Sequence, residues 1–483
     1  MAALAVALPG LGAIATLILW RRTVAVAALA ATATLGAVAG LAHGVWVQQA
    51  AVRVAVGRWQ PPLGIELRAD GLSVLMLCLS GCVMALTGVY ASRYLDHGRA
   101  AGKRHFWPLA MLLWMGLNAL FLASDAFNLY VTLEVVSLSG VALTALGGDR
   151  AALAAALRYL FAGMLASLLY LLGVALLYIE HGTLSLTALG AALGASRAGP
   201  LATALILTGL LFKGALFPLH FWLPTAHANA PAPVSALLSA LVVKAALYLL
   251  LRWWLEVWGP GLSWGVAQLI GTLGALAVLW GSTQALLAPR LKLVVAYSTV
   301  AQMGYLLLIF PLAHDATAMA LVWSGVVYFA ISHGLAKAAM FLAAGNAMRL
   351  HGHDNIAGLA GLGAHMPVSA FAMALAGISL IGLPFSGGFV GKWLMLNAAL
   401  AAGQWWWLML LALGSLLAAA YVFRVLRLIF VTPEHTPAGR LPGALEWPAL
   451  LLALAAIVLG FTFTALAPLI DIGAPGAALG LRP

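Results

Sequence analysis

The sequence predicts an all-α polytopic membrane protein with about 14 transmembrane helices. The chain has 483 residues, of which 64% are hydrophobic and only 8% are charged, whereas a soluble domain is about 25% charged. Apolar runs long enough to cross the hydrocarbon core as helices recur along the whole chain. The basic residues stand singly or in small groups between these runs, as the anchors of membrane loops do. The net charge of +11 is therefore not gathered into a patch for nucleic acid.

The expected helices are the apolar runs that charged residues, glycine or proline interrupt. In chain order they cover residues 2–20, 23–43, 72–94, 105–123, 126–146, 153–179, 200–228, 233–256, 264–287, 291–312, 317–349, 367–402, 405–431 and 447–470. The seventh and the twelfth are long, and we expect both to be discontinuous. Pro218 and Pro224 break the seventh in FPLHFWLP, and Pro384 breaks the twelfth in GLPFSGGFVGK.

The order of these helices predicts an N-terminal three-helix segment, two five-helix repeats, and a last helix with its tail. Their bounds are residues 1–104, 105–256, 264–431 and 432–483. LEVVSLSG at 133–140 overlays YSTVAQMG at 297–304, and the two discontinuous helices overlay each other. Because each repeat has an odd number of helices, the second must enter the membrane from the opposite side. The repeats are therefore expected to be inverted, an arrangement that places transport sites near the membrane midplane.

The basic residues of alternate loops predict the orientation in the membrane. One side holds Arg21, Arg22, Arg93, Arg99, Lys103, Arg104, Arg150, Arg158, Arg290, Lys292, Arg349, Arg424, Arg427 and Arg440. The other side holds only Arg53, Arg58, Arg68, Arg197, Arg252 and Arg482. Cytoplasmic loops carry the excess of lysine and arginine. Both termini are therefore expected on the non-cytoplasmic side of the cytoplasmic (inner) membrane.

Lysines inside the expected helices are the main candidates for function. They are Lys213, Lys244, Lys337 and Lys392, in the seventh, eighth, eleventh and twelfth helices. A lysine at the bilayer centre costs roughly 2.5–3.5 kcal/mol on the insertion scale, so such residues are rare without a function. A buried amine can take up and release a proton near neutral pH, whereas a guanidinium stays charged. A series of lysines therefore suits a proton relay, and the alternative is that they are helix-end lysines that reach the headgroups.

Three further residues fit the same path. Glu134 lies inside the fifth helix, and an intramembrane carboxylate needs a partner, for which Lys213 is expected. The alternative is a purely structural ion pair. His220 and His333 suit intermediate steps, because histidine titrates near physiological pH. His227 lies nearer a helix end and is not included in the predicted path.

The second repeat has Ser298 at the position that overlays Glu134, so Lys392 has no corresponding carboxylate.

No cofactor or metal site is predicted. Cys78 and Cys82 lie on one face of an apolar helix, and the chain has no second cysteine pair. It also has no phosphate-binding glycine motif.

Several stretches resemble the antiporter-like subunits that respiratory complex I, membrane-bound hydrogenases and Mrp-type cation/proton antiporters share. They are DAFNLYVTLEVVSLSG, FPLHFWLPTAHANAPAPVSALLSA, SHGLAKAAMFLAAG and SGGFVGKW, and the resemblance covers at least residues 105–430. These stretches are most similar to the D-type Mrp antiporter subunits and the hydrogenase-linked relatives. In that family, the glutamate of the fifth helix and the lysines of the seventh, eighth and twelfth carry protons. These map to Glu134, Lys213, Lys244 and Lys392.

The resemblance implies a proton-translocating subunit of a larger membrane complex. Its expected partners are other membrane subunits, the lipid bilayer and protons, with Na⁺ as a possible second ion. The chain is not expected to be an enzyme by itself, although its complex can be an NADH:quinone oxidoreductase or a hydrogenase. Two alternatives from other classes remain: a quinone-binding subunit of a membrane oxidoreductase, and a stand-alone secondary transporter.

Overall fold

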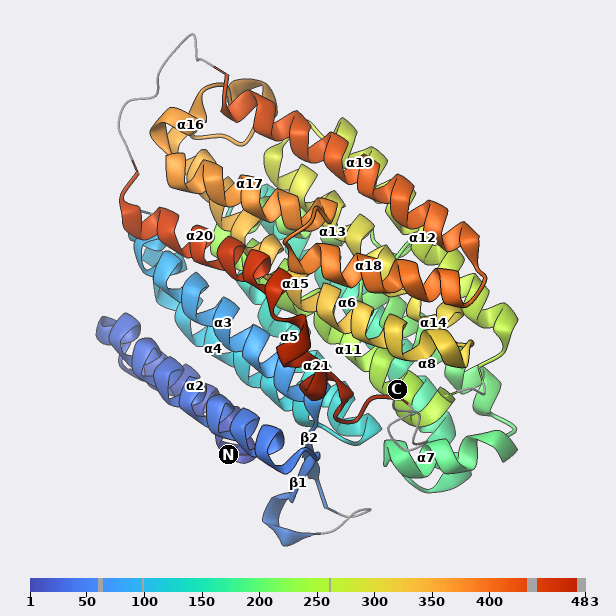
Figure 1. Ribbon diagram of the computed structural model, residues 1–483. Helices are drawn as coiled ribbons and strands as arrows, with labels where there is room; N and C mark the ends of the chain where they lie inside the picture. Colours follow the sequence, from blue (N-terminus) through green and yellow to red (C-terminus); the bar gives the residue numbers. More distant parts are fainter. Residues whose placement is uncertain (60–63, 98–99, 260–261, 432–440, 476–483) are drawn as a thin grey trace.

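The computed structural model describes residues 1–59, 64–97, 100–259, 262–431 and 441–475, which form a bundle of helices lying side by side (Figure 1). The elements before residue 232 are α1 (Ala2–Ile18), α2 (Thr23–Gln48), β1 (Val52–Ala55), β2 (Glu66–Ala69), α3 (Gly71–Tyr94), α4 (Ala100–Leu122), α5 (Ala126–Ala145), α6 (Arg150–His181), α7 (Leu186–Ala192), α8 (Gly199–Lys213) and α9 (Leu223–Asn229). The later elements are α10 (Ala232–Leu237), the π-helical turn η5 (Leu238–Val242), α11 (Val243–Trp253), the π-helical turn η6 (Trp254–Trp258), α12 (Trp264–Leu287), α13 (Leu291–Leu306), α14 (Ile309–Leu312), α15 (Ala316–His351), α16 (Leu362–His365), α17 (Pro367–Ile381), α18 (Gly387–Ala401), α19 (Trp405–Ile429), α20 (Gly443–Val458) and α21 (Phe463–Asp471).

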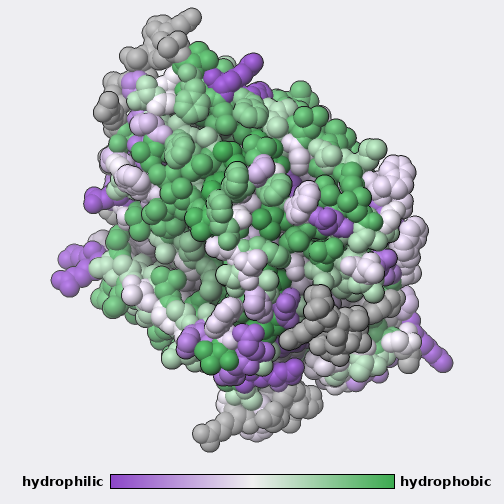
Figure 2. Space-filling model, in the orientation of Figure 1, coloured by the Kyte–Doolittle hydropathy of each residue, from purple (hydrophilic) through white to green (hydrophobic). Residues whose placement is uncertain are grey.

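The prediction of an all-α membrane protein is confirmed. Eleven described helices are long and apolar enough to cross a membrane, and the shorter apolar helices α1, α8 and α17 lie among them. Each predicted helical range contains helix in the structure. Figure 2 shows hydrophobic side chains over most of the visible face, with hydrophilic residues mainly around its margin. Such a surface is suited to a hydrocarbon environment.

Two small elements depart from the predicted helices. β1 pairs with β2 as an antiparallel ribbon in which Val52 lies opposite Ala69. The short helix α7 lies between α6 and α8. Both occur in connections whose apolar runs are too short to span a membrane, so a search for spans does not find them.

The centre of the bundle is formed by α15 and by the continuous segment from α10 to η6. The most apolar stretch of each is completely buried. α15 packs against α3, α10, α13, α17, α18 and α20, and it runs through the middle of the bundle in Figure 1. These two buried segments carry Lys244 and Lys337.

The seventh predicted helix is broken. α8 ends at Lys213, residues 214–222 form successive turns, and α9 resumes with Pro224 in its first turn. Pro218 lies within the turns. The carbonyl of Phe212, which loses its helical partner, accepts hydrogen bonds from Trp222 Nε1 and from the Ala215 amide, each at 3.1 Å. The break is therefore closed by local hydrogen bonds, as a helix end inside protein requires.

The twelfth predicted helix is also broken, over residues 382–386 between α17 and α18. Gly382 ends α17 in the left-handed conformation, with φ of +84°. A Cβ at this position would lie 2.9 Å from Cδ of Lys392. Pro384 follows in the turn. Glycine at position 382 thus serves both the backbone conformation and the close approach of the Lys392 side chain.

Candidate functional site

The first part of the candidate site is an ion pair between α5 and α8. Lys213 Nζ lies 3.0 Å from Glu134 Oε1 and donates to Ser137 Oγ at 2.6 Å. Ser167 of α6 donates to the same carboxylate oxygen. The Lys213 side chain is 4% exposed and that of Glu134 is 23% exposed. The carboxylate is therefore the more accessible member of the pair, and three helices supply its surroundings.

The second part is Lys244, which is completely buried on α11. Its Nζ donates to the carbonyl of Ser239 at 2.6 Å. Ser239 belongs to the π-helical turn η5, an element that the periodicity of the sequence did not predict. Single π turns inside α helices are found frequently at functional sites. No carboxylate pairs with Lys244 in the described part of the chain.

A line of hydrogen bonds continues from this turn to Lys337. The hydroxyls of Ser239 and Thr299 lie 2.9 Å apart, and Thr299 donates to the Val295 carbonyl at 3.0 Å. Lys337 Nζ on α15 donates to the same carbonyl at 3.0 Å and also to Ser298. Two lysines from different predicted repeats are thus joined through α13. No comparable bond joins Lys213 to Lys244 among the residues that the structure describes.

Lys392 occupies a different environment on α18. Its Nζ donates to the carbonyls of Leu380 and Ile381 at the end of α17, and to Ser415 Oγ, each at 3.1 Å. The ammonium also lies 4.6 Å from the ring centre of Tyr305. Carbonyl dipoles and an aromatic face favour a cation without neutralising it. These groups take the place of the carboxylate that Glu134 supplies to Lys213.

The predicted histidines lie in two places. His333 is buried on α15, and its ring stacks on Phe329 with the ring centres 6.0 Å apart. Its electrostatic neighbours are Lys244, Lys337 and Lys392. His220 lies in the turns between α8 and α9 against the ring of Phe217. In the described ranges no hydrogen bond joins it to a lysine, so the structure places His333, and not His220, among the central cations.

Two residues that the predicted path omits lie near the same centre. His227 is completely buried, and both of its ring nitrogens lack a partner among the described residues. Lys292 is 1% exposed, and its Nζ donates to the carbonyl of Ala230. The charges of Lys292, Lys244 and Lys337 all act on His227. Lys292, which the sequence places at a helix end on the cytoplasmic side, is thus covered by protein at the start of α13.

A second charged cluster fills the space between the start of α3 and the end of α11. Arg252 binds Asp70 through two nitrogens at 2.5 and 2.6 Å, and it donates to Ser73 at 2.8 Å. Arg68 lies 3.2 Å from Asp70 and 3.0 Å from Glu256. The Arg252 side chain is only 2% exposed. Arg252, which the sequence places at a helix end on the non-cytoplasmic side, is thus held inside the protein by acidic partners distant in sequence.

The balance of forces on Asp70 accounts for this pairing. Burial raises the pKa of Asp70, but the positive charges of Arg252 and Arg68 and the hydrogen bonds from Arg252 and Ser73 outweigh that effect. The pKa of Asp70 is consequently below its ordinary value. The carboxylate is thus held in its charged form, as a two-pronged arginine contact requires.

We expect Arg252→Met to lower the free energy of unfolding by about 3–5 kcal/mol, because it leaves the carboxylate of Asp70 buried with only part of its compensation. Arg53→Met is the matched control. Arg53 faces Glu66 at 3.5 Å with its side chain 57% exposed, so its loss should cost less than about 1 kcal/mol. Thermal unfolding in detergent measures both. Equal unfolding temperatures for the two variants would show that the buried pair does not stabilise the fold.

Within the described residues no group of three or more His, Cys, Asp or Glu side chains is placed to hold a metal ion. Cys78 and Cys82 are free thiols. The chemistry of the candidate site is accordingly carried by amines, one carboxylate, imidazoles and hydroxyls. Hydroxyls both donate and accept hydrogen bonds, so they can pass protons between amines.

The fold and the site together define an all-helical membrane protein with two discontinuous helices and buried lysines at its centre. Residues 123–418 match the family described as NADH:quinone oxidoreductase/Mrp antiporter, transmembrane. The chain belongs to this family, so the predicted resemblance to antiporter-like subunits is confirmed.

Three similar proteins illustrate the relationship. The chain is 36% identical over 429 residues to NADH-quinone oxidoreductase subunit N of Desulforudis audaxviator, with 84% of each chain covered. It is 30% identical over 424 residues to the D-type subunit of the Na(+)/H(+) antiporter of Bacillus subtilis, covering 86% of this chain and 84% of that protein. Among solved structures, a chain of the Mrp complex from a Dietzia species superposes with a TM-score of 0.89 at 27% identity, covering 99% of this chain and 97% of that one.

Proposed function

We propose that this chain is a proton-translocating, antiporter-like subunit of a multi-subunit membrane complex of the Mrp, complex I or hydrogenase-linked type. The observation that carries the proposal is the line from Lys244 through Ser239, Thr299 and Val295 to Lys337. Buried amines without carboxylates have little structural use, because their desolvation is not offset by a counter-charge. A role in proton exchange, by contrast, gives a reason for buried amines without carboxylates.

In the proposed mechanism, protons move by charge rearrangement along Glu134, Lys213, Lys244, Lys337 and Lys392. Glu134 is the accessible carboxylate at which a proton or cation is first stabilised beside Lys213. The charges of Lys244, Lys337 and Lys392 all act on His333, and the charge of Lys244 acts on Lys337, so a proton on one of these lysines disfavours a proton on the group it acts on. His333 is suited to an intermediate step, and His227 shares Lys244 and Lys337 with it as charged neighbours. His220, in the turns of the broken helix after Lys213, is proposed for a further intermediate step.

The membrane arrangement belongs to the same proposal: 14 crossings, two inverted repeats, and both termini on the non-cytoplasmic side of the cytoplasmic membrane. The repeats are supported by packing, because α4 packs on α5 and α6 on α8, as α12 packs on α13 and α15 on α17. The regions 1–104, 105–256, 264–431 and 432–483 remain the proposed division. Of the residues that predict the orientation, Arg99, Arg440 and Arg482 lie outside the described residues.

Single cysteines at the exposed positions 22, 427 and 197 test this orientation in a background lacking Cys78 and Cys82. Cysteines that replace Arg22 and Arg427 should be protected from an impermeant thiol reagent added outside the cell. A cysteine that replaces Arg197 should react. Permeabilised cells, in which all three should react, are the control. Outside labelling at position 22 or 427 would contradict the proposed orientation and, with it, the inverted repeats.

Proton transport by the purified complex in vesicles, followed with a pH-sensitive dye, tests the proposed function. We expect transport by the complex and none by this chain alone, because the chain conducts protons while partner subunits supply the redox reaction or the driving gradient. Transport by the isolated chain would favour a stand-alone transporter. Quinone reduction by the isolated chain would favour a quinone-binding enzyme subunit. Replacing Na⁺ by choline in the same assay identifies the second ion.

A further inference from the structure

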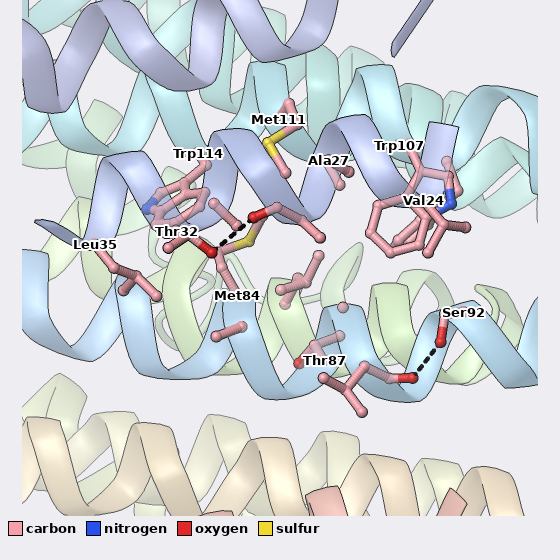
Figure 3. Close-up of a pocket in the computed structure, with 18 residues that line it drawn as sticks. Val24, Ala27, Thr32, Leu35, Met84, Thr87, Ser92, Trp107, Met111 and Trp114 are labelled. Atoms are coloured by element: carbon pink, nitrogen blue, oxygen red, sulfur yellow. Dashed lines mark hydrogen bonds between the residues drawn. The ribbon is translucent and has the colours of Figure 1, made fainter. Parts of the chain in front are cut away.

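An apolar groove between α2, α3 and α4 lies away from the lysines and has no part in the proposed mechanism. Its volume is about 290 Å³. Val24 and Thr32 line it from α2, Met84 from α3 and Trp107 from α4, as Figure 3 shows. Leu237, the last residue of α10, also lines it. The groove therefore begins at the outer helix α2, at one edge of the bundle in Figure 1, and reaches the segment next to η5.

The chemistry of the groove favours a hydrocarbon chain over water. The hydroxyl of Thr32 is bonded to the Ala28 carbonyl and that of Ser92 to the Val89 carbonyl, so neither seeks another partner. Among the described residues that line the groove, only Thr87 presents a buried hydroxyl without a hydrogen-bond partner. Apolar cavities stay dry, and one of about 150 Å³ holds a benzene molecule, so this groove accommodates roughly ten to twelve carbon atoms.

The groove cannot remain empty in a bilayer without losing dispersion contacts along its whole lining. α2 is the least buried of the long apolar helices, so the groove lies beside a membrane-facing helix. The neighbouring molecules there are phospholipids, and an acyl chain has the shape and apolarity that the lining requires.

Basic residues stand one helical turn beyond the end of the groove. Arg21 precedes Val24 on one side, and Arg104 precedes Trp107 on the other. Both guanidinium groups lie 5.3 Å from the ring centre of Trp20, so the indole brings them together. Arg22 is exposed beside them. Paired arginines bind phosphate groups, and basic residues at the ends of transmembrane helices attract anionic headgroups.

We propose that this groove is a binding site for one anionic phospholipid. An acyl chain lies between α2, α3 and α4, and the phosphate is bound by Arg21 and Arg104 beside Trp20. The Thr87 hydroxyl is available to an ester carbonyl of the lipid. The tip of the chain contacts Leu237, next to the π-helical turn whose Ser239 carbonyl holds Lys244. The site is independent of the proposed proton path, since none of its residues belongs to that path.

Photocrosslinking in vesicles tests the site. The complex is reconstituted in phosphatidylcholine that contains a minor fraction of phosphatidylglycerol with a diazirine on its acyl chain, and labelled peptides are mapped by mass spectrometry. We expect labels on the peptides that carry Thr32, Met84 and Trp107. Ala28→Trp fills the groove and should abolish these labels. Leu416→Trp, at an exposed position on α19, is the matched control and should leave them unchanged.

A second variant keeps the groove intact and tests the headgroup. Arg21→Gln combined with Arg104→Gln should reduce labelling by phosphatidylglycerol to the level given by the same probe on phosphatidylcholine. Equal labelling by the two lipids in the wild-type protein would overturn the anionic selectivity. Unchanged labelling in Ala28→Trp would place the chain elsewhere. Displacement of the probe by quinone would assign the groove to a quinone tail instead. Labelling of the isolated chain that is lost in the assembled complex would assign it to a protein partner.

Discussion

Lys392→Arg is expected to yield an assembled complex that no longer moves protons, with a loss of roughly a hundredfold or more, the range of a missing acid–base group. Arginine keeps the positive charge and can donate to the carbonyls of Leu380 and Ile381, but it does not release its proton. If the role of Lys392 is to pass a proton on, charge alone does not replace it. Proton uptake into vesicles measures the effect, and gel filtration confirms assembly.

Two variants sharpen this expectation. Lys392→His should retain measurable transport with a pH dependence different from that of the wild type, because imidazole titrates near physiological pH. Ser415→Ala removes one hydrogen bond to the ammonium while both carbonyls remain, so it should lose no more than about tenfold. Wild-type transport by the arginine variant would show that Lys392 acts as a fixed charge, and the relay would then end at Lys337.

Glu134→Gln is the second change for which we expect a large effect, again roughly a hundredfold loss of transport. Glutamine has nearly the same shape and can still bond Ser167 and Lys213, so the complex should assemble. It lacks the charge that stabilises the ammonium of Lys213 at 3.0 Å, and it cannot take up a proton.

Ser167→Ala serves as the control for Glu134→Gln, because it removes one hydrogen bond to the carboxylate and keeps the charge. Its expected loss is no more than about tenfold. If the glutamine variant transports protons normally in the assembled complex, the pair between α5 and α8 is structural, and the first repeat must conduct by another route.

The sequence predicts the helices and the central lysines because both leave local signals. An apolar run of about 20 residues has few alternatives to a membrane helix. Within such a run, Lys213, Lys244, Lys337 and Lys392 stand out as charges without nearby partners. Proline and glycine mark the breaks after α8 and α17 for equally local reasons.

The remaining features depend on contacts between distant segments. Arg252 looks like a helix-end residue until Asp70, at the start of α3, is placed beside it. Lys292 likewise follows a loop in sequence, but the chain around Ala230 covers it. The π-helical turn η5 leaves no distinctive periodicity, since Ser239 is its one polar residue and the other four are apolar. Sequence reasoning therefore finds the charges but cannot say which of them are buried at helix ends.

His227 illustrates the same limit. It lies in a stretch with four prolines, where the boundary of the helix cannot be set from the letters alone. Its burial follows from packing against Phe341 of α15, with the ring centres 5.5 Å apart. The sequence does contain one signal for His227: the residue lies between two breaks in the helix, within the motif shared with the family.

The central claim is that the buried lysines of the two halves are coupled through Thr299, whose hydroxyl bonds the Ser239 hydroxyl and the Val295 carbonyl that Lys337 also contacts. Thr299→Val removes that hydroxyl with almost no change of shape, and Thr299→Ser retains it. The deciding measurement is the initial rate of proton uptake by the assembled complex in vesicles for these two variants. We predict that the valine variant loses roughly tenfold or more while the serine variant stays near the wild type. Wild-type uptake by Thr299→Val would contradict the claim.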